Sequence, residues 1–213
     1  MKDDLSPLLV IGPHTDDAEL GCGAAIARLV HLGVDVFIAA LSTAEASLPP
    51  GSAPDRLREE FQAAAPALGI PADHLFVYDY PVRQLSSYRQ DVLDELLRIR
   101  RRVAPKAVFV PSPHDVHQDH QVVSNEALRA FKDITLWGYE LPWNHVTFSA
   151  QAFITVERTH LECKWKAMQA YRSQMELARS YFTWEFIEGL ARVRGVQVKS
   201  EYAEAFEVIR IRL

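Results

Sequence analysis

The chain of 213 residues has a formal net charge of −5, and 48% of its residues are hydrophobic and 24% charged. This balance predicts a single domain over residues 1–213 with a sizeable core, and it argues against nucleic acid as a partner. The sequence has no apolar run of about 18 residues and no signal-peptide pattern, so it predicts no membrane span and a cytoplasmic location. Cys22 and Cys163 are too few for a disulfide framework. The sequence leaves open whether the protein forms a homo-oligomer.

Hydrophobic periodicity predicts strands that alternate with helices along the chain. Expected strands lie at 8–11, 34–41, 74–78, 107–110, 134–141, 153–156 and 202–211. The first expected helix contains Ala24 and Val30 and ends at Gly33. Further helices are expected at 55–68, 92–103 and 122–131, and the stretch 161–189 is expected to be mostly helical. This alternation predicts an α/β fold, a Rossmann-like doubly wound and largely parallel sheet with helices on both faces.

A polar cluster follows the first expected strand, where Gly12 and Pro13 end the apolar run. His14, Asp16 and Asp17 crowd a histidine and two acids at the end of a buried strand, which is unfavourable without a positive charge among them. The spacing of three between His14 and Asp17 aims both at one point, as for a divalent metal, and leaves the Asp16 carboxylate free. The alternative is a solvated loop in which Asp17 caps the next helix.

A second cluster follows the strand expected at 107–110 and contains His114, His117 and His120, with Asp115 and Asp119 between them. The spacing of His117 and His120 can place both imidazoles at one site, and Asp119 can hold one imidazole by a hydrogen bond. We expect His114 to be the dispensable histidine, a loop residue that hydrogen-bonds locally.

The two clusters are expected to meet, because loops after the first and fourth strands of a doubly wound sheet can lie side by side at its switch point. Together they offer two histidines and one carboxylate with an open position for water, which is the ligand set of a catalytic zinc site. Asp16 and His117 then remain for proton transfer and oxyanion stabilisation.

The motifs H-T-D-D-A-E-L-G-C-G and H-Q-D-H resemble the paired motifs of the PIG-L/LmbE-like de-N-acetylases. These zinc hydrolases remove acetyl groups from N-acetylated amino sugars. The resemblance implies that His14, Asp17 and His120 are the zinc ligands, although another divalent metal such as Fe²⁺ is compatible with them. It also implies Asp16 as general base and His117 as the electrophilic or acid histidine.

The resemblance assigns two further residues and the substrate class. Asp119 would orient His117, and Arg56 is a substrate contact by analogy with the family. Thr15 stands where the family usually has proline, which removes no ligand. The expected substrate is an N-acetylglucosamine-like sugar. Whether this sugar is free, glycosidic, nucleotide-linked or lipid-linked stays open.

The loops expected at 42–54, 79–87 and 142–149 all follow strands and can surround one pocket, where Trp143 could pack against a sugar. Two rival functions stay open, a metal-dependent phosphoesterase and a non-catalytic sugar-binding module. A dinucleotide site is disfavoured, because Ile26 stands where the third small residue of that fingerprint belongs.

Overall fold

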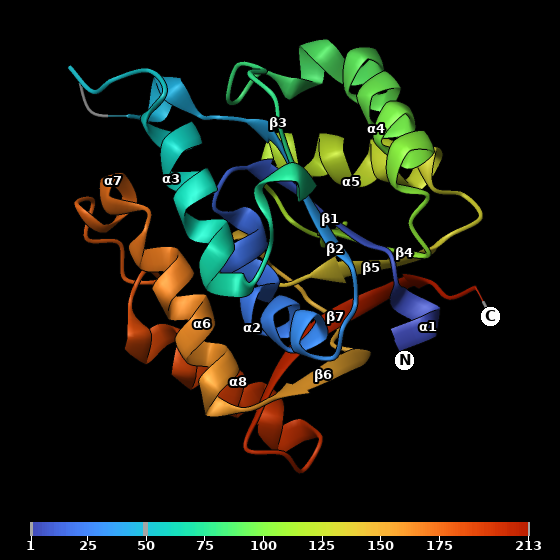
Figure 1. Cartoon of the computed structure of the whole chain (residues 1–213), viewed down its shortest axis with the longest axis vertical. Helices are drawn as coiled ribbons and strands as arrows, with labels where there is room; N and C mark the ends of the chain where they lie inside the picture. The colour runs from blue at the N-terminus through green and yellow to red at the C-terminus, as the bar shows by residue number, and fades with distance from the viewer. Residues whose placement is uncertain (1, 49–50, 213) are drawn as a thin grey trace.

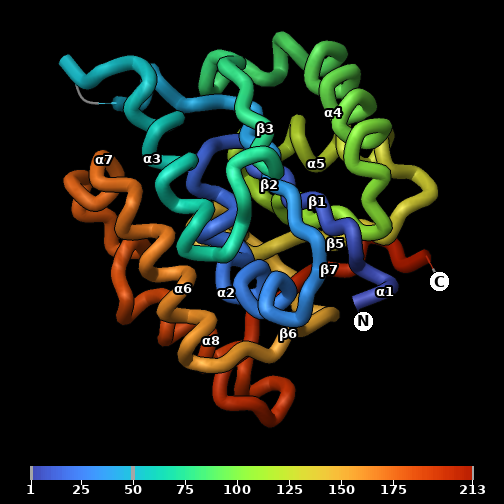
Figure 2. Tube along the Cα trace, in the orientation of Figure 1, coloured from blue at the N-terminus to red at the C-terminus, as the bar shows by residue number. Residues whose placement is uncertain are grey.

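The computed structural model describes residues 2–48 and 51–212, which form a seven-stranded sheet covered by helices (Figures 1 and 2). The strands are β1 (Leu8–His14), β2 (Val36–Ser42), β3 (Leu75–Val77), β4 (Ala107–Pro111), β5 (Thr135–Tyr139), β6 (Ala152–Val156) and β7 (Tyr202–Arg210). The α-helices are α1 (Lys2–Leu5), α2 (Asp17–His31), α3 (Arg56–Ala64), α4 (Arg89–Val103), α5 (Gln118–Ala130), α6 (Arg158–Gln169), α7 (Arg172–Met175) and α8 (Trp184–Gln197). Short 3-10 helices lie at Glu45–Ser47, Ala65–Leu68, Ala72–His74, Leu85–Tyr88 and Pro142–Asn144.

The strand order in the sheet is β3-β2-β1-β4-β5-β7-β6. Neighbouring strands in the part β3-β2-β1-β4-β5 run parallel to each other. Strand β7 pairs antiparallel with both β5 and β6. The predicted largely parallel α/β fold is therefore confirmed, with an antiparallel edge that hydrophobic periodicity could not reveal because it carries no information on strand direction. β1 pairs with β2 on one side and β4 on the other, which makes the carboxyl end of β1 the switch point.

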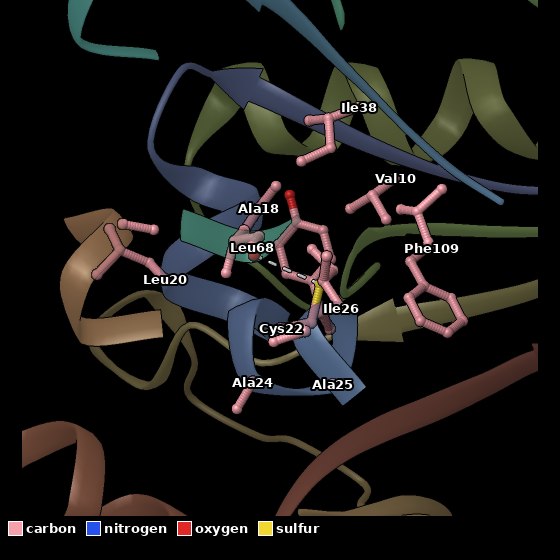
Figure 3. Close-up of a cluster of buried hydrophobic side chains, with 14 of the residues drawn as sticks. Val10, Ala18, Leu20, Cys22, Ala24, Ala25, Ile26, Ile38, Leu68 and Phe109 are labelled. Carbon is pink, nitrogen blue, oxygen red and sulfur yellow. Dashed lines mark hydrogen bonds between the residues drawn. The ribbon is translucent and has the colours of Figure 1, made fainter. Parts of the chain in front are cut away.

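Helices cover both faces of the sheet, as expected (Figure 1). On one face α4 and α5 pack over a core cluster that includes Leu96 and Val123, and on the other α2 lies at the centre of a second cluster. Figure 3 shows this second cluster, in which Val10, Ile38 and Phe109 of the strands lie beside α2. The N-terminus of α2 is thus held against the sheet directly after β1.

The largest differences between the expected helices and the structure are at three places. The stretch expected at 161–189 is divided into α6, α7 and α8, with non-helical segments between them. The helix expected at 55–68 becomes a 3-10 helix after Ala64, where Pro66 removes a backbone donor. The helix expected at 122–131 begins four residues earlier, at Gln118, so His120 lies inside α5 rather than before it. In the part of the chain that the structure describes, no helix is long and apolar enough to cross a membrane.

Candidate metal centre

The two polar clusters meet at the carboxyl ends of β1 and β4. His14 is the last residue of β1 and Asp17 the first of α2, while His117 caps the N-terminus of α5 and His120 lies in its first turn. Their proximity follows from the pairing of β1 with β4, which brings residues more than 100 positions apart into contact. The predicted convergence of the clusters is therefore confirmed.

Three atoms in this cluster form a nearly equilateral triangle. His14 Nδ1 lies 3.1 Å from Asp17 Oδ2 and 3.4 Å from His120 Nε2, and His120 Nε2 lies 3.4 Å from Asp17 Oδ2. A tetrahedral zinc ion with bonds of about 2.0–2.2 Å separates its ligand atoms by about 3.3–3.6 Å. The triangle therefore has the dimensions of one face of a zinc tetrahedron.

The nitrogens of His14, His117 and His120 form a wider group, in which all ligand atoms lie within 4.8 Å of one another. This group could also hold a metal ion. The two candidate ligand sets share His14 and His120 and differ in whether Asp17 or His117 completes them.

Both shared histidines are oriented by buried carboxylates. His14 Nε2 lies 3.1 Å from Asp119 Oδ2, and His120 Nδ1 lies 2.7 Å from Asp115 Oδ2. Each imidazole thus has one nitrogen facing a carboxylate, which selects the tautomer that leaves the other nitrogen free as an acceptor in the triangle. This carboxylate–histidine arrangement is common at protein metal sites.

The expectation that the Asp119 carboxylate orients His117 is wrong. That carboxylate contacts His14 and accepts hydrogen bonds from the backbone N–H groups of Arg83 and Leu85, at 2.5 and 3.2 Å. It is turned inward because residue 119 lies in the first turn of α5, on the side that faces β1 and loop 79–87. His117 is instead held by the backbone N–H of Asp119, which donates to its Nδ1 over 3.2 Å.

Asp115 is a site residue that the sequence analysis named in the cluster without giving it a role. It is 1% exposed, and its Oδ1 accepts a hydrogen bond from the backbone N–H of His117 while Oδ2 faces His120. In the sequence, the signal for this role is that Asp115 lies five residues before the candidate ligand His120, in the segment H-D-V-H-Q-D-H. By contrast, the exposed His114 side chain pairs with Glu207 of β7 at 2.9 Å and does not line the pocket.

The charges around the triangle favour a cation at its centre. Burial opposes a charge on His14, but Asp17 and Asp119 outweigh it and raise the pKa of His14 to about 10. Burial likewise opposes a charge on Asp17, yet His120 and His14 hold its pKa below the ordinary value. These buried carboxylates therefore stabilise positive charge at the point where the three ligand atoms converge, and a divalent cation supplies such charge.

Asp16 and His117 border the same site with different properties. Burial and then the negative charge of Asp17 raise the pKa of Asp16 to about 6, and its carboxylate makes no capping hydrogen bond with α2. Burial, followed by the charges of His120 and His14, lowers the pKa of His117. Asp16 can thus exchange a proton near neutral pH, while His117 is neutral there.

A buried tyrosine supports the loop between β1 and α2. The Tyr171 hydroxyl lies 2.6 Å from the Thr15 carbonyl oxygen and 2.9 Å from Glu19 Oε1. Burial raises the pKa of Glu19 to about 8, so this carboxyl holds a proton at neutral pH. The Tyr171 hydroxyl is a hydrogen-bond donor to both the Thr15 carbonyl oxygen and Glu19 Oε1, so it links the loop after β1 to the first turn of α2.

A pocket of about 300 Å³ opens over the triangle, at the small end of the range of ligand sites. His14, Asp16, Asp17, His117 and His120 lie at its base, and the three predicted loops surround it, as expected. These loops contribute Ala44, Ser47, Val82, Arg83, Trp143 and Asn144. Pro49 and Pro50 of the first loop lie outside the described residues.

The pocket walls differ from the expectation in one residue. Arg56 does not line the pocket, because its guanidinium pairs with Glu60 at 3.2 Å and with Glu176 at 2.7 Å, while its neighbour Leu57 faces inward. Arg83 and Arg179 line the pocket instead. Trp143 stacks on Tyr181 with ring centroids 3.9 Å apart, and both rings contribute to the wall.

Comparison with known protein families finds one match over more than half of the chain. The model of the family described as "PIG-L: GlcNAc-PI de-N-acetylase" matches residues 9–131, from β1 to the end of α5. This segment contains every residue of the two motifs.

Individual proteins of two different activities are similar to this chain. The uncharacterized deacetylase YaiS of Escherichia coli is 27% identical over 173 residues, which are 78% of this chain and 90% of that protein. The 4-oxalmesaconate hydratase of Pseudomonas putida is 26% identical over 212 residues, which are 90% of this chain and 80% of that protein. Among solved structures, the conserved protein TT1542 from Thermus thermophilus superposes with a TM-score of 0.81 at 26% identity, covering 98% of this chain and 96% of that one.

Proposed function

Because the chain belongs to the PIG-L family of de-N-acetylases, we propose that it is a zinc-dependent hydrolase that removes the acetyl group from an N-acetylated amino sugar. The products are the free amine and acetate. The observation that carries the proposal is the triangle of His14 Nδ1, Asp17 Oδ2 and His120 Nε2, with edges of 3.1, 3.4 and 3.4 Å at the base of a pocket.

We assign His14, Asp17 and His120 as the zinc ligands in preference to the three histidines. The atoms of the first set have the spacing of zinc ligands, and the two imidazoles are held by Asp119 and Asp115. His117 lacks a carboxylate partner of this kind, since its Nδ1 accepts from a backbone N–H. Bound zinc supplies Lewis acidity, which activates water and polarises a carbonyl oxygen. Another divalent metal such as Fe²⁺ would serve the same purpose.

Asp16 and His117 carry out the proton chemistry. Asp16, with a pKa of about 6, is ionised at neutral pH and accepts a proton from the water that attacks the acetamide carbonyl. The neutral His117 has its proton on Nε2, because Nδ1 is an acceptor, and this N–H donates to the developing oxyanion. Protonated Asp16 then returns its proton to the leaving nitrogen, so one water cleaves one amide into amine and acetate.

The test is acetate release from a panel of N-acetyl sugars, including N-acetylglucosamine and N,N′-diacetylchitobiose, with and without a chelator. We expect acetate release that the chelator abolishes and added Zn²⁺ restores. Phosphate release from a parallel phosphoester panel would favour the phosphoesterase. Sugar binding with neither product would favour a binding module. Either result would contradict the proposal.

A second candidate function is a hydratase, because the 4-oxalmesaconate hydratase matches 90% of the chain at nearly the same identity as the deacetylase. A hydratase also activates water, but it adds the water to a double bond and releases no acetate. Incubation with 4-oxalmesaconate, followed by its ultraviolet absorbance, separates the two activities. Turnover of this acid without acetate release from any sugar would assign the chain to the hydratase.

A further inference from the structure

Helix α2, which begins with the proposed ligand Asp17, is interrupted at Cys22. The φ and ψ angles of Cys22 are −149° and 26°, outside the helical region, so a kink separates residues 17–21 from the rest of the helix. The Cys22 thiol donates to the Ala18 carbonyl oxygen over 3.4 Å (Figure 3). Because Asp17 lies on the short first segment, the geometry of the kink affects where its carboxylate lies.

Two backbone groups beside the kink bond to side chains of other elements. The Leu20 carbonyl oxygen accepts from Lys164 Nζ of α6 over 2.7 Å. The Ala25 N–H donates to Glu204 Oε2 of β7 over 2.6 Å. In an uninterrupted helix both backbone groups would bond within the helix, to partners four residues away. The two side chains are thus inserted where the helical hydrogen bonds are broken, which is a known cause of helix kinks.

Lys164 and Glu204 also bond to each other. Lys164 Nζ lies 2.6 Å from Glu204 Oε1, and the two side chains are 5% and 7% exposed. A chain of hydrogen bonds therefore runs from the Leu20 carbonyl through both side chains to the Ala25 N–H, with one contact on each side of the kink. The lysine stem packs closely here, because a Cβ atom on Gly23 would lie 3.0 Å from Lys164 Cγ.

Stability alone does not account for a buried ion pair at this place. Desolvation of two charges offsets much of their attraction, and apolar residues of similar volume often give a protein of equal stability. Apolar residues would supply neither a donor for the Leu20 carbonyl nor an acceptor for the Ala25 N–H, and both of these residues are buried. The pair is therefore explained by the backbone groups that the kink leaves without helical partners.

We infer that Lys164 and Glu204 are positioning residues, which fix the kink in α2 and so hold Asp17 at the candidate metal centre. Neither is among the described residues that line the pocket over that centre, so both act through the backbone of α2. The inference rests on the proposed metal centre. It adds two residues of α6 and β7, which lie outside the segment 9–131 that the family model matches.

The experiment measures zinc affinity, kcat, KM and the urea midpoint of unfolding in variants of the pair. Lys164→Met removes the donor, and Glu204→Gln keeps the side-chain volume and one acceptor oxygen. The double variant Lys164→Met with Glu204→Leu removes both charges, so neither is left unpaired. Arg194→Met is the matched control, because it breaks the ion pair of Arg194 with the buried Glu140. Within the described residues, no hydrogen bond joins that pair to α2.

We expect the double variant to be more stable than Lys164→Met, because it leaves no buried charge without a partner. Both variants should nevertheless bind zinc about tenfold more weakly and lose about tenfold in kcat at saturating zinc, since small displacements of catalytic groups have effects of this size or larger. KM should change less, because the aromatic wall of the pocket lies on other elements. Arg194→Met should lower the urea midpoint and leave zinc affinity unchanged.

A role in stability alone gives a different pattern. Zinc affinity and kcat would then recover with stability in the double variant, which would overturn the inference. Equal weakening of zinc binding in Arg194→Met and in the variants of the pair would also overturn it. Should Lys164→Met fail to fold, Glu204→Gln decides, because it preserves the volume of the side chain. Wild-type zinc affinity in folded Glu204→Gln would contradict the positioning role, whereas weakened affinity would support it.

The outcome is distinguishable from failure of the proposed metal centre. If the wild-type protein binds no zinc, the metal centre fails, and crystal structures of the variants then decide the inference alone. A displaced Asp17 carboxylate relative to His120 in the variants of the pair, with none in Arg194→Met, would support the positioning role. An Asp17 carboxylate that stays in place in Glu204→Gln and in the double variant would overturn it.

Discussion

Replacing Gly21 with alanine tests how closely α2 must approach the sheet to place Asp17. A Cβ atom at Gly21 would lie 2.3 Å from Cδ2 of Tyr139, where ordinary contact begins at 3.4 Å, an overlap of 1.1 Å by difference. Tyr139 cannot retreat easily, because it is fully buried and its hydroxyl donates to the Ile11 carbonyl of β1 over 3.0 Å. Helix α2 must therefore shift.

We expect Gly21→Ala to lower the free energy of unfolding by about 1–3 kcal/mol, the usual effect of overpacking a core. Gly189→Ala is the matched control, since Gly189 lies in α8, is exposed and has nothing within 4 Å of an added Cβ. That substitution should raise the free energy of unfolding by about 0.5–1 kcal/mol through helix propensity.

The assay is urea unfolding of both variants, combined with a zinc titration. Because α2 begins with Asp17, a shift of this helix should weaken zinc binding in Gly21→Ala and leave it unchanged in Gly189→Ala. Equal or greater stability of Gly21→Ala relative to the wild-type protein would refute the packing argument. Unchanged zinc affinity in a destabilised Gly21→Ala would refute the argument that the position of α2 sets the position of the proposed ligand Asp17.

Three further predictions concern the metal centre. Asp17→Ala and His120→Ala should lose zinc, as measured by elemental analysis, because each removes one of the three proposed ligands, whereas His114→Ala should retain it. Asp115→Ala should weaken zinc binding by about 10–100-fold in a competition assay with a chelator, because His120 loses its orienting carboxylate. Asp16→Asn should keep zinc and lower kcat by about 10²–10⁴, because it removes the proposed base.

Each of these predictions has an outcome that contradicts it. Near-stoichiometric zinc in Asp17→Ala, with loss in His117→Ala, would favour the three histidines as the ligand set. Wild-type zinc affinity in a folded Asp115→Ala would remove its orienting role. Full turnover by Asp16→Asn would move the base to another residue, and damage by His114→Ala greater than by His117→Ala would reverse the roles of these histidines.

Much of the fold was predictable because it depends on local patterns. The buried runs of β1, β2 and β4 and the apolar spacing in α4 are properties of short segments, and the structure has these elements within a few residues of the expected bounds. The convergence of His14 and Asp17 is also local, since three residues separate them. The division of the expected helix at 161–189 was not predictable in this way, because the breaks after Gln169 and Met175 lie within a stretch of helical composition.

The sequence by itself determined which chemical groups are present and that two of its clusters follow strands. Only the tertiary structure decided which carboxylate holds which histidine, with Asp119 at His14 and Asp115 at His120. It also decided that Leu57 rather than Arg56 faces the pocket, since successive helical residues point about 100° apart. The physical reason is that such partners depend on the register of β1 against β4 and on how the helices pack, and both are set by contacts between residues distant in the chain.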